Sequence, residues 1–284
     1  MSSAVQTGRF NVYWLLVAPA LLLVLVLYAA PILNVLLLSF ADPKPGLGNY
    51  YKIVESDTVS RLIFTTIRLC LITTIASVTL GYIVAYAMLH AFSTMRQRMM
   101  SILLISFWIS VLVRSFAWLM LLGHNGLLNN ALMAGGIIAE PLPIMRNEFG
   151  VLIGMTEYMI PYAILPLLAN MQGIDLRVTS ASRSLGASNV QTFFRVFLPL
   201  TRPGIVAASL LVFISSLGFY VTPAILGGGK VQMIAEYISV QLLVTVRWGT
   251  AAMLATLMLV SVLVLMYVLN RFMRLSTVFG GGPR

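Results

Sequence analysis

Long apolar runs alternate with shorter polar connections along the whole chain. Each run can cross about 30 Å of hydrocarbon as a helix, which rises about 1.5 Å per residue. The first run is long enough to tilt or to extend past the membrane, so we interpret it as a retained span rather than a cleaved leader. The pattern predicts an all-α integral membrane protein, a single domain over 1–284 with six transmembrane helices at about 13–40, 64–89, 101–122, 150–169, 204–226 and 251–272.

The composition supports the bilayer as the main solvent. Hydrophobic residues make up 60% of the chain and charged residues 9%, whereas a soluble domain has about a quarter charged residues. The formal net charge of +10 would suit nucleic acid, but the basic residues collect at one membrane face, where they set orientation and contact anionic headgroups. We therefore expect membrane lipid, and no nucleic acid, as a partner. Cys70 is a lone cysteine, and His90 and His124 are far from any carboxylate cluster in the sequence, so no metal site is expected.

The basic residues also predict the orientation. With six spans, both termini lie on the same side as the second and fourth connections. This side has one acid, Asp175, and the basic residues Arg9, Arg96, Arg98, Arg177, Arg183, Arg195, Arg202, Arg271, Arg274 and Arg284. The positive-inside rule places both termini and the fourth connection in the cytoplasm, because the basic residues of the opposite side are balanced by acids. The outer connections 123–149 and 227–250 are rich in Gly, Asn and Pro and predict half-helices or packed loops.

The fourth connection contains a polar, basic insert of helical character, 180–199, with the sequence SASRSLGASNVQTFFRVFLP. Asp175 fits the N-cap of a first short helix, and Gly186 can turn the chain with a positive φ. Ser188 and Gln191 form a capping-box pattern for a second helix. An interfacial helix lying on lipid and a docking element for a soluble partner both fit this segment. The second helix would carry one apolar face formed by Val190, Phe193, Phe194 and Phe197.

The same segment resembles the EAA loop of ABC importer permeases. The shared features are a small-Ala-small triplet at 180–182, Gly186 after three further residues, and Leu198-Pro199 near the end. Further similarity lies in GNY at 48–50, FWISVLVRSFAW at 107–118, LGHNGLLN at 122–129 and TPAILGG at 222–228, and the last three resemble the spermidine/putrescine branch. The resemblance covers most of the chain from about residue 48. It implies a type I ABC importer architecture, with a cytoplasmic coupling-helix loop at 171–203 between the fourth and fifth helices.

By this resemblance the chain is the membrane-spanning permease of an ATP-driven importer in the bacterial cytoplasmic (inner) membrane. Its expected partners are a second permease subunit, an ATP-binding subunit dimer and an extracytoplasmic substrate-binding protein. Ser180 replaces the family's glutamate and Ser182 its second alanine, which removes a charge-assisted hydrogen bond. We favour a weaker-coupled half of a heterodimer over a compensating ATPase surface as the explanation. The residues expected to couple to the ATPase are Ser180, Ala181, Ser182, Arg183, Gly186, Ala187, Ser188, Phe193, Phe194, Leu198 and Pro199.

ATP chemistry is not expected in the chain itself. A phosphate-binding loop has the pattern G-x-x-x-x-G-K-[ST]. The nearest sequence, GGGK at 227–230, has Ala224 in place of the first glycine and Val231 in place of the hydroxyl residue. We therefore predict that the chain is not itself an enzyme and binds no cofactor. ATP and Mg would be bound by the separate ATPase subunit.

Ionisable and aromatic side chains inside the spans are candidates for a substrate path, because burying charge in lipid is costly. Glu157 is either an electrostatic partner for a cationic substrate or a neutral or paired carboxyl. Arg114 is either a structural tie, to carbonyls or to Glu157, or a ligand contact. Residues of the fifth span either line a passage or pack helices closely. The candidate path residues are Glu157, Tyr158, Tyr162, Arg114, Trp118, Phe219, Tyr220 and Thr222.

Two other classes of membrane protein fit parts of the pattern. An ion-coupled secondary transporter would need more acids within the spans than Glu157, and a non-transporting scaffold would not need a partly polar fifth span. For an importer, a polyamine or related amine or organic ion is expected from the branch that the chain resembles. An amino-acid derivative or a phosphonate is the alternative, because specificity in such systems can reside in the binding protein.

Overall fold

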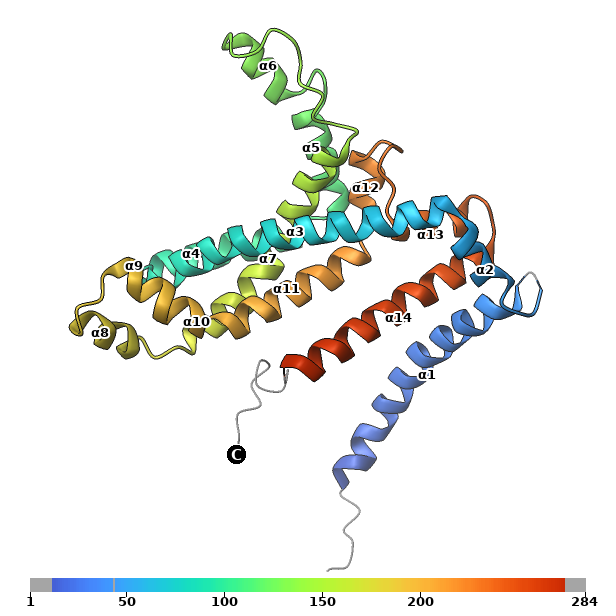
Figure 1. Ribbon diagram of the computed structural model, residues 1–284, viewed down its shortest axis with the longest axis horizontal. Helices are drawn as coiled ribbons and strands as arrows, with labels where there is room; N and C mark the ends of the chain where they lie inside the picture. The colour runs from blue at the N-terminus through green and yellow to red at the C-terminus, as the bar shows by residue number, and fades with distance from the viewer. Residues whose placement is uncertain (1–11, 43, 274–284) are drawn as a thin grey trace, which may run out of the picture.

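The computed structural model describes residues 12–42 and 44–273, and all regular elements in these ranges are helices (Figure 1). Five segments are long and apolar enough to cross a membrane, and the bent pair Asn189–Leu200 and Arg202–Leu217 would make a sixth span. Arg9, Arg274 and Arg284, on which the predicted orientation partly depends, lie outside the described residues. In chain order the elements are α1 Val12–Ala41, α2 Gly48–Glu55, α3 Asp57–His90, α4 Ser93–Trp108, α5 Val111–Leu122, α6 Leu127–Ala134, α7 Glu148–Gln172, α8 Arg177–Ser184, α9 Asn189–Thr192, the π-helix η1 Phe193–Phe197, α10 Leu198–Leu200, α11 Arg202–Leu217, α12 Val221–Leu226, α13 Ile234–Leu243 and α14 Trp248–Met273.

Three long helices, α3, α7 and α11, pack against one another and form the core of the molecule. Small residues allow the close approach. A Cβ placed on Gly81 of α3 would lie 2.8 Å from the Cβ of Ala163 in α7, and one placed on Gly204 of α11 would lie 2.7 Å from the Cβ of Asn170. Gly204 therefore serves close helix packing, one of the two roles considered for the fifth span. The buried side chains of this core include Met159, Ala163, Leu167, Met171, Ala208 and Val212.

Two of the predicted spans are interrupted. The run 101–122 is divided at Ile109 and Ser110, between α4 and α5, and the run 204–226 is divided at residues 218–220, between α11 and α12. The apolar pattern predicted continuous helices in both places, because hydropathy does not distinguish a helical from an extended apolar residue. Gly218 is the C-cap of α11, whereas no glycine or proline marks the first break. After that break, α5 and α6 project away from the three-helix core (Figure 1).

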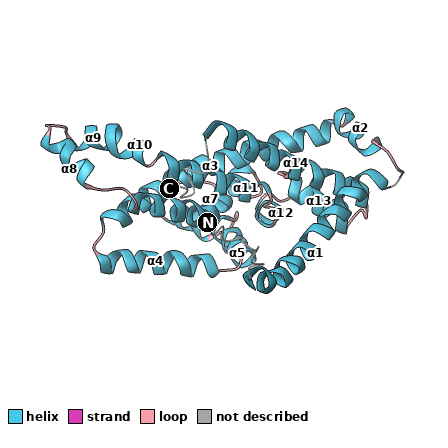
Figure 2. Cartoon of the chain, turned by 90° about the horizontal axis from the view of Figure 1, so that it is seen from below, coloured by secondary structure: helices cyan, strands magenta, loops and turns pink. Residues whose placement is uncertain are grey.

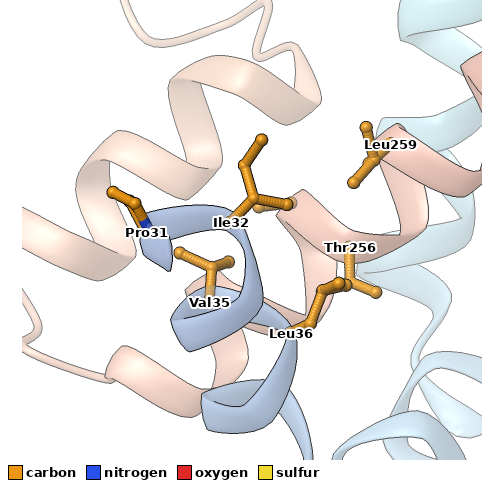
Figure 3. A pocket seen from close by; sticks show the side chains of 7 residues that line it. Pro31, Ile32, Val35, Leu36, Thr256 and Leu259 are labelled. Carbon is orange, nitrogen blue, oxygen red and sulfur yellow. The ribbon is translucent and has the colours of Figure 1, made fainter. Parts of the chain in front are cut away.

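The helices α1 and α14 form a pair beside this core. At one end of the pair, the Gly249 amide donates a hydrogen bond to Asp42 Oδ2 at 2.7 Å. Leu22 of α1 is 68% exposed, as expected for a helix that faces lipid. An apolar groove of about 240 Å³ runs between the two helices and is lined by Pro31, Ile32, Val35, Leu36, Ala255, Thr256 and Leu259 (Figure 3).

The connections that we expect on the outer side contain short helices, the first of which also ends the candidate span Val111–Ala134. α6 lies within 123–149 and α13 within 227–250. The Ile234 amide at the start of α13 donates a hydrogen bond to Thr66 Oγ1 of α3 at 2.9 Å. Arg68 of α3 forms an ion pair with Glu148 at the start of α7. The ends of α3, α7 and α13 on this side are thus joined by polar contacts.

Candidate functional site

The 171–203 segment extends from one end of the three-helix core (Figure 2). Asp175 was predicted as the N-cap of the first short helix, but the N-cap of α8 is Leu176, and Asp175 Oδ1 accepts a hydrogen bond from the Arg177 amide at 2.9 Å from one residue earlier. Gly186 then turns the chain with a φ of 90°. Ser188 and Gln191 form the predicted capping box, since Ser188 Oγ accepts from Gln191 N at 3.2 Å and Gln191 Oε1 accepts from Ser188 N at 3.0 Å. The prediction of two short helices separated by a glycine turn is confirmed.

The prediction that Val190, Phe193, Phe194 and Phe197 form one apolar face of the second helix is wrong. This helix continues as the π-helix η1, and only Phe193 and Phe197 face the core, where their rings lie 5.5 Å and 5.3 Å from the ring of Tyr86 in α3. Phe197 is 3% exposed, whereas Phe194 and Val190 are 60% and 65% exposed. The reason is that α3 alone supplies the aromatic partner, Tyr86. One neighbouring helix covers only two of the four apolar side chains of the segment.

Most residues predicted to couple to an ATPase are accessible. α8 contains no buried residue, and Ser180, Ala181 and Arg183 within it are exposed, as are Gly186 and Ser188 after it. Five of the predicted residues are half-buried: Ser182, Ala187, Phe193, Leu198 and Pro199. The sequence analysis missed Leu185, which is 89% exposed and adds to the apolar surface. Leu185 follows Val178 and Ala181 at helical spacing, but it lies just after α8 and outside the triplet at 180–182 that carried the resemblance.

A second group of predicted residues comes together between α5 and α7. Glu157 Oε1 accepts a hydrogen bond from Arg114 Nη1 at 3.2 Å, and Glu157 Oε2 accepts one from Trp118 Nε1 at 3.4 Å. The Arg114 guanidinium carbon lies 5.2 Å from the ring centre of Tyr158, which is within cation–π range. The Tyr158 ring centre lies 5.9 Å from that of Tyr162 and 4.8 Å from that of Phe219. We define the Glu157 cluster as Arg114, Trp118, Glu157, Tyr158, Tyr162 and Phe219.

The two charged groups of the Glu157 cluster differ in exposure. The side chain of Arg114 is 9% exposed and that of Glu157 is 34% exposed. Two cavities of about 360 Å³ and 330 Å³ adjoin the cluster, and Ser106 and Glu157 line both of them. Ser106 Oγ accepts a second hydrogen bond from Arg114, from Nη2 at 3.0 Å. The structure contains the tie from Arg114 to Glu157 that the sequence analysis considered.

Two of the predicted path residues lie outside the cluster. Thr222 is buried in α12 with its Oγ1 3.2 Å from Ser115 Oγ, and Tyr220 is 46% exposed. The sequence analysis missed Ser106 and also Phe107, whose ring lies 4.8 Å from the ring of a cluster tyrosine. Both residues lie at the end of α4, next to the break that the apolar pattern did not predict.

The chain is similar to known transport permeases over most of its length. The family described as binding-protein-dependent transport system inner membrane component matches residues 77–276. The spermidine/putrescine transport system permease protein PotB of Haemophilus influenzae is 32% identical over 73% of this chain and 73% of its own length. The protein of the same name from Escherichia coli (strain K12) is 30% identical over 81% of this chain and 84% of its own length.

Solved structures share the fold. A bacterial ABC transporter involved in the import of the acidic polysaccharide alginate contains a chain that matches with a TM-score of 0.73 at 19% identity, over 92% of this chain and 96% of that chain. A bacterial alginate ABC transporter in complex with an alginate pentasaccharide-bound periplasmic protein matches with a TM-score of 0.74 at 16% identity, over 94% of this chain and 95% of that chain. This chain therefore belongs to the family of binding-protein-dependent transport system inner membrane components and is a permease subunit of an ABC importer.

Proposed function

We propose that this permease moves a small organic cation of the polyamine type past the Glu157 cluster. The observation that carries the proposal is the position of the Glu157 carboxylate, which lines two adjoining cavities beside the rings of Trp118 and Tyr158. A carboxylate next to aromatic faces attracts an ammonium group both by charge and by cation–π interaction. The relatives from Haemophilus influenzae and Escherichia coli are named as spermidine/putrescine permeases, which supports the same class of solute.

The interrupted spans support a path at this position. Ser106, just before the break between α4 and α5, contacts Arg114, and Phe219, in the break between α11 and α12, packs on Tyr158. Non-helical backbone at membrane depth is tolerated where it is buried in protein or lines a water-filled cavity. Both breaks therefore lie beside the Glu157 cluster, as expected for a path at this position.

Other solutes and mechanisms are less well supported. A phosphonate would meet the Glu157 carboxylate, while the Arg114 guanidinium is 9% exposed and already paired. An amino-acid derivative would bring an anionic group to the same carboxylate. The two relatives described above are named as transport system permease proteins, and the family is described as a component of binding-protein-dependent transport systems, so the secondary-transporter alternative is not favoured.

The 171–203 segment is the proposed docking site of a separate ATP-binding subunit dimer, which would hold ATP and Mg²⁺. Its exposed apolar side chains, Leu185, Val190 and Phe194, offer a surface for a soluble partner. The contact of Phe193 and Phe197 with Tyr86 would transmit movement of the segment to α3.

The rest of the importer is also part of the proposal. The segment and both termini would lie in the cytoplasm, and the whole chain would form one permease domain. A second, different permease subunit and an extracytoplasmic binding protein would complete the assembly. Ser180 Oγ bonds within its own helix, to the Leu176 carbonyl at 3.4 Å, which supports assigning this chain to the weaker-coupled half.

The test is uptake of radiolabelled putrescine by the complete transporter in proteoliposomes, with Glu157→Gln compared with Glu148→Gln. Both substitutions remove one carboxylate from α7, but Glu148 pairs with Arg68 outside the Glu157 cluster. Loss of one charge-assisted contact, about 1.5–3 kcal/mol, should lower kcat/KM about 10- to 100-fold in Glu157→Gln alone. Wild-type uptake by Glu157→Gln would contradict the proposal.

A further inference from the structure

The Arg114 guanidinium already makes the two contacts that the proposed function assigns to the ammonium group of the cargo. Its Nη1 donates to Glu157 Oε1 at 3.2 Å, and its carbon lies 5.2 Å from the ring centre of Tyr158. We propose that Arg114 is an internal substitute for the cargo cation, which occupies the site until a solute amine displaces it. This inference rests on the proposed function, because it takes Glu157 and Tyr158 as cargo contacts.

A carboxylate in this position needs a counter-charge between transport cycles. The Glu157 side chain is 34% exposed and lines two open pockets of a membrane protein, where an unpaired charge is costly. Arg114 supplies that counter-charge from within the chain, with its own side chain 9% exposed. The site is therefore neutral overall when empty, and a cation can enter only by exchange with the guanidinium.

Arg114 has a second contact, to Ser106, that can hold its guanidinium after the bond to Glu157 is broken. Its Nη2 donates to Ser106 Oγ at 3.0 Å, and Ser106 lines both cavities. The break at Ile109 and Ser110 separates Ser106 in α4 from Arg114 in α5, so the two residues can shift relative to each other without unwinding a helix. A displaced guanidinium can keep its bond to Ser106, and its charge then repels the bound amine and favours onward movement of the amine.

The direction in which cargo affinity changes when Arg114 is removed separates this role from the others considered for Arg114. A residue that contacts the cargo as a ligand, or that only ties α5 to α7, would leave cargo affinity unchanged or lower it when removed. A substitute cation competes with the cargo, so its removal raises cargo affinity. The competition is for Glu157 Oε1 and the ring face of Tyr158, both of which Arg114 contacts in the structure.

The experiment is equilibrium binding of radiolabelled putrescine to the complete transporter in lipid nanodiscs, without nucleotide or binding protein. Arg114→Ala should bind putrescine about 10- to 100-fold more tightly than the wild type, because one charge-assisted contact no longer has to be broken. Millimolar guanidinium ion should compete with putrescine in this variant, while urea, its neutral analogue, should not. Adding Glu157→Gln to Arg114→Ala should abolish the gain.

Putrescine binding by Arg114→Ala that is equal to or weaker than wild-type binding overturns the inference. Because this variant also removes the tie between α5 and α7, Ser106→Ala serves as a second variant. It keeps the ion pair but removes the bond that the displaced guanidinium would keep, and should weaken putrescine binding about three- to tenfold; unchanged or tighter binding again overturns the inference. The two proposals can fail separately. Uptake that does not depend on Glu157 refutes the proposed function. Uptake that depends on Glu157, without tighter putrescine binding in Arg114→Ala, refutes only the inference that Arg114 takes the place of the cargo cation.

Discussion

Replacing Phe197 with alanine is expected to detach the 171–203 segment from α3, whereas replacing Phe194 should leave it attached. Phe197 is 3% exposed, with its ring 5.3 Å from that of Tyr86 and 6.1 Å from that of Phe193. Truncation of such a phenylalanine costs about 3–5 kcal/mol, because buried contacts are lost and a cavity is left. Phe194 is 60% exposed, so its truncation should cost about 1 kcal/mol or less.

Limited proteolysis measures this difference directly. Trypsin cleavage after Arg195, which lies in the π-helix between the two phenylalanines, requires the segment to open. A loss of 3–5 kcal/mol raises the open population by about 150-fold to about 4,000-fold, and the cleavage rate follows it when opening is faster than cleavage. Co-purification of the ATPase subunit is the second readout, and here Phe194→Ala should show the direct loss. Equal cleavage rates in the two variants would refute the division of the apolar face into a buried and an exposed half.

Two further predictions concern packing and charge. Gly81→Ala should destabilise the permease by about 1–2 kcal/mol in thermal unfolding, since the new Cβ would lie 2.8 Å from the Cβ of Ala163; Gly48→Ala, with open space around it, is the control, and equal melting temperatures would contradict the close contact. Burial raises the pKa of the Glu236 carboxyl in α13 above its ordinary 4.5. The folded state then holds more protons than the unfolded state just above pH 4.5, so stability should fall as pH rises through this range. Glu236→Gln should be more stable than the wild type at pH 7 and lose that part of the pH dependence, and parallel stability curves for the two proteins would contradict the prediction.

Local sequence was sufficient where a structure depends on neighbouring residues. The capping box of Ser188 and Gln191 and the turn at Gly186 follow from side-chain and backbone chemistry within a few positions. The ion pair of Arg114 and Glu157 was one of the alternatives considered, because a charge within a span needs a partner. The capping box and the turn are set by residues close in the sequence. The ion pair joins residues that are far apart, but the energetic cost of an unpaired charge predicts it.

The features that were missed depend on contacts between distant helices. The break at Ile109 and Ser110 carries no glycine or proline, so the apolar run looks like one helix. The role of Ser106 follows from that break and was invisible for the same reason. Likewise, the position of α3 decides which phenylalanines of the 171–203 segment are buried. The periodicity within the segment contains no information about that neighbouring helix.

The pairing of α1 with α14 has a consequence for how the protein is made. A ribosome synthesises α1 well before α14, so the first helix enters the bilayer before the helix that it contacts in the folded protein exists. Its most apolar stretch contains no buried residue, so the helix can reside in lipid alone. Insertion of α1 and its docking on α14 are thus separate events in biogenesis, and the hydrogen bond from Gly249 to Asp42 helps to set the register between helices that were inserted at different times.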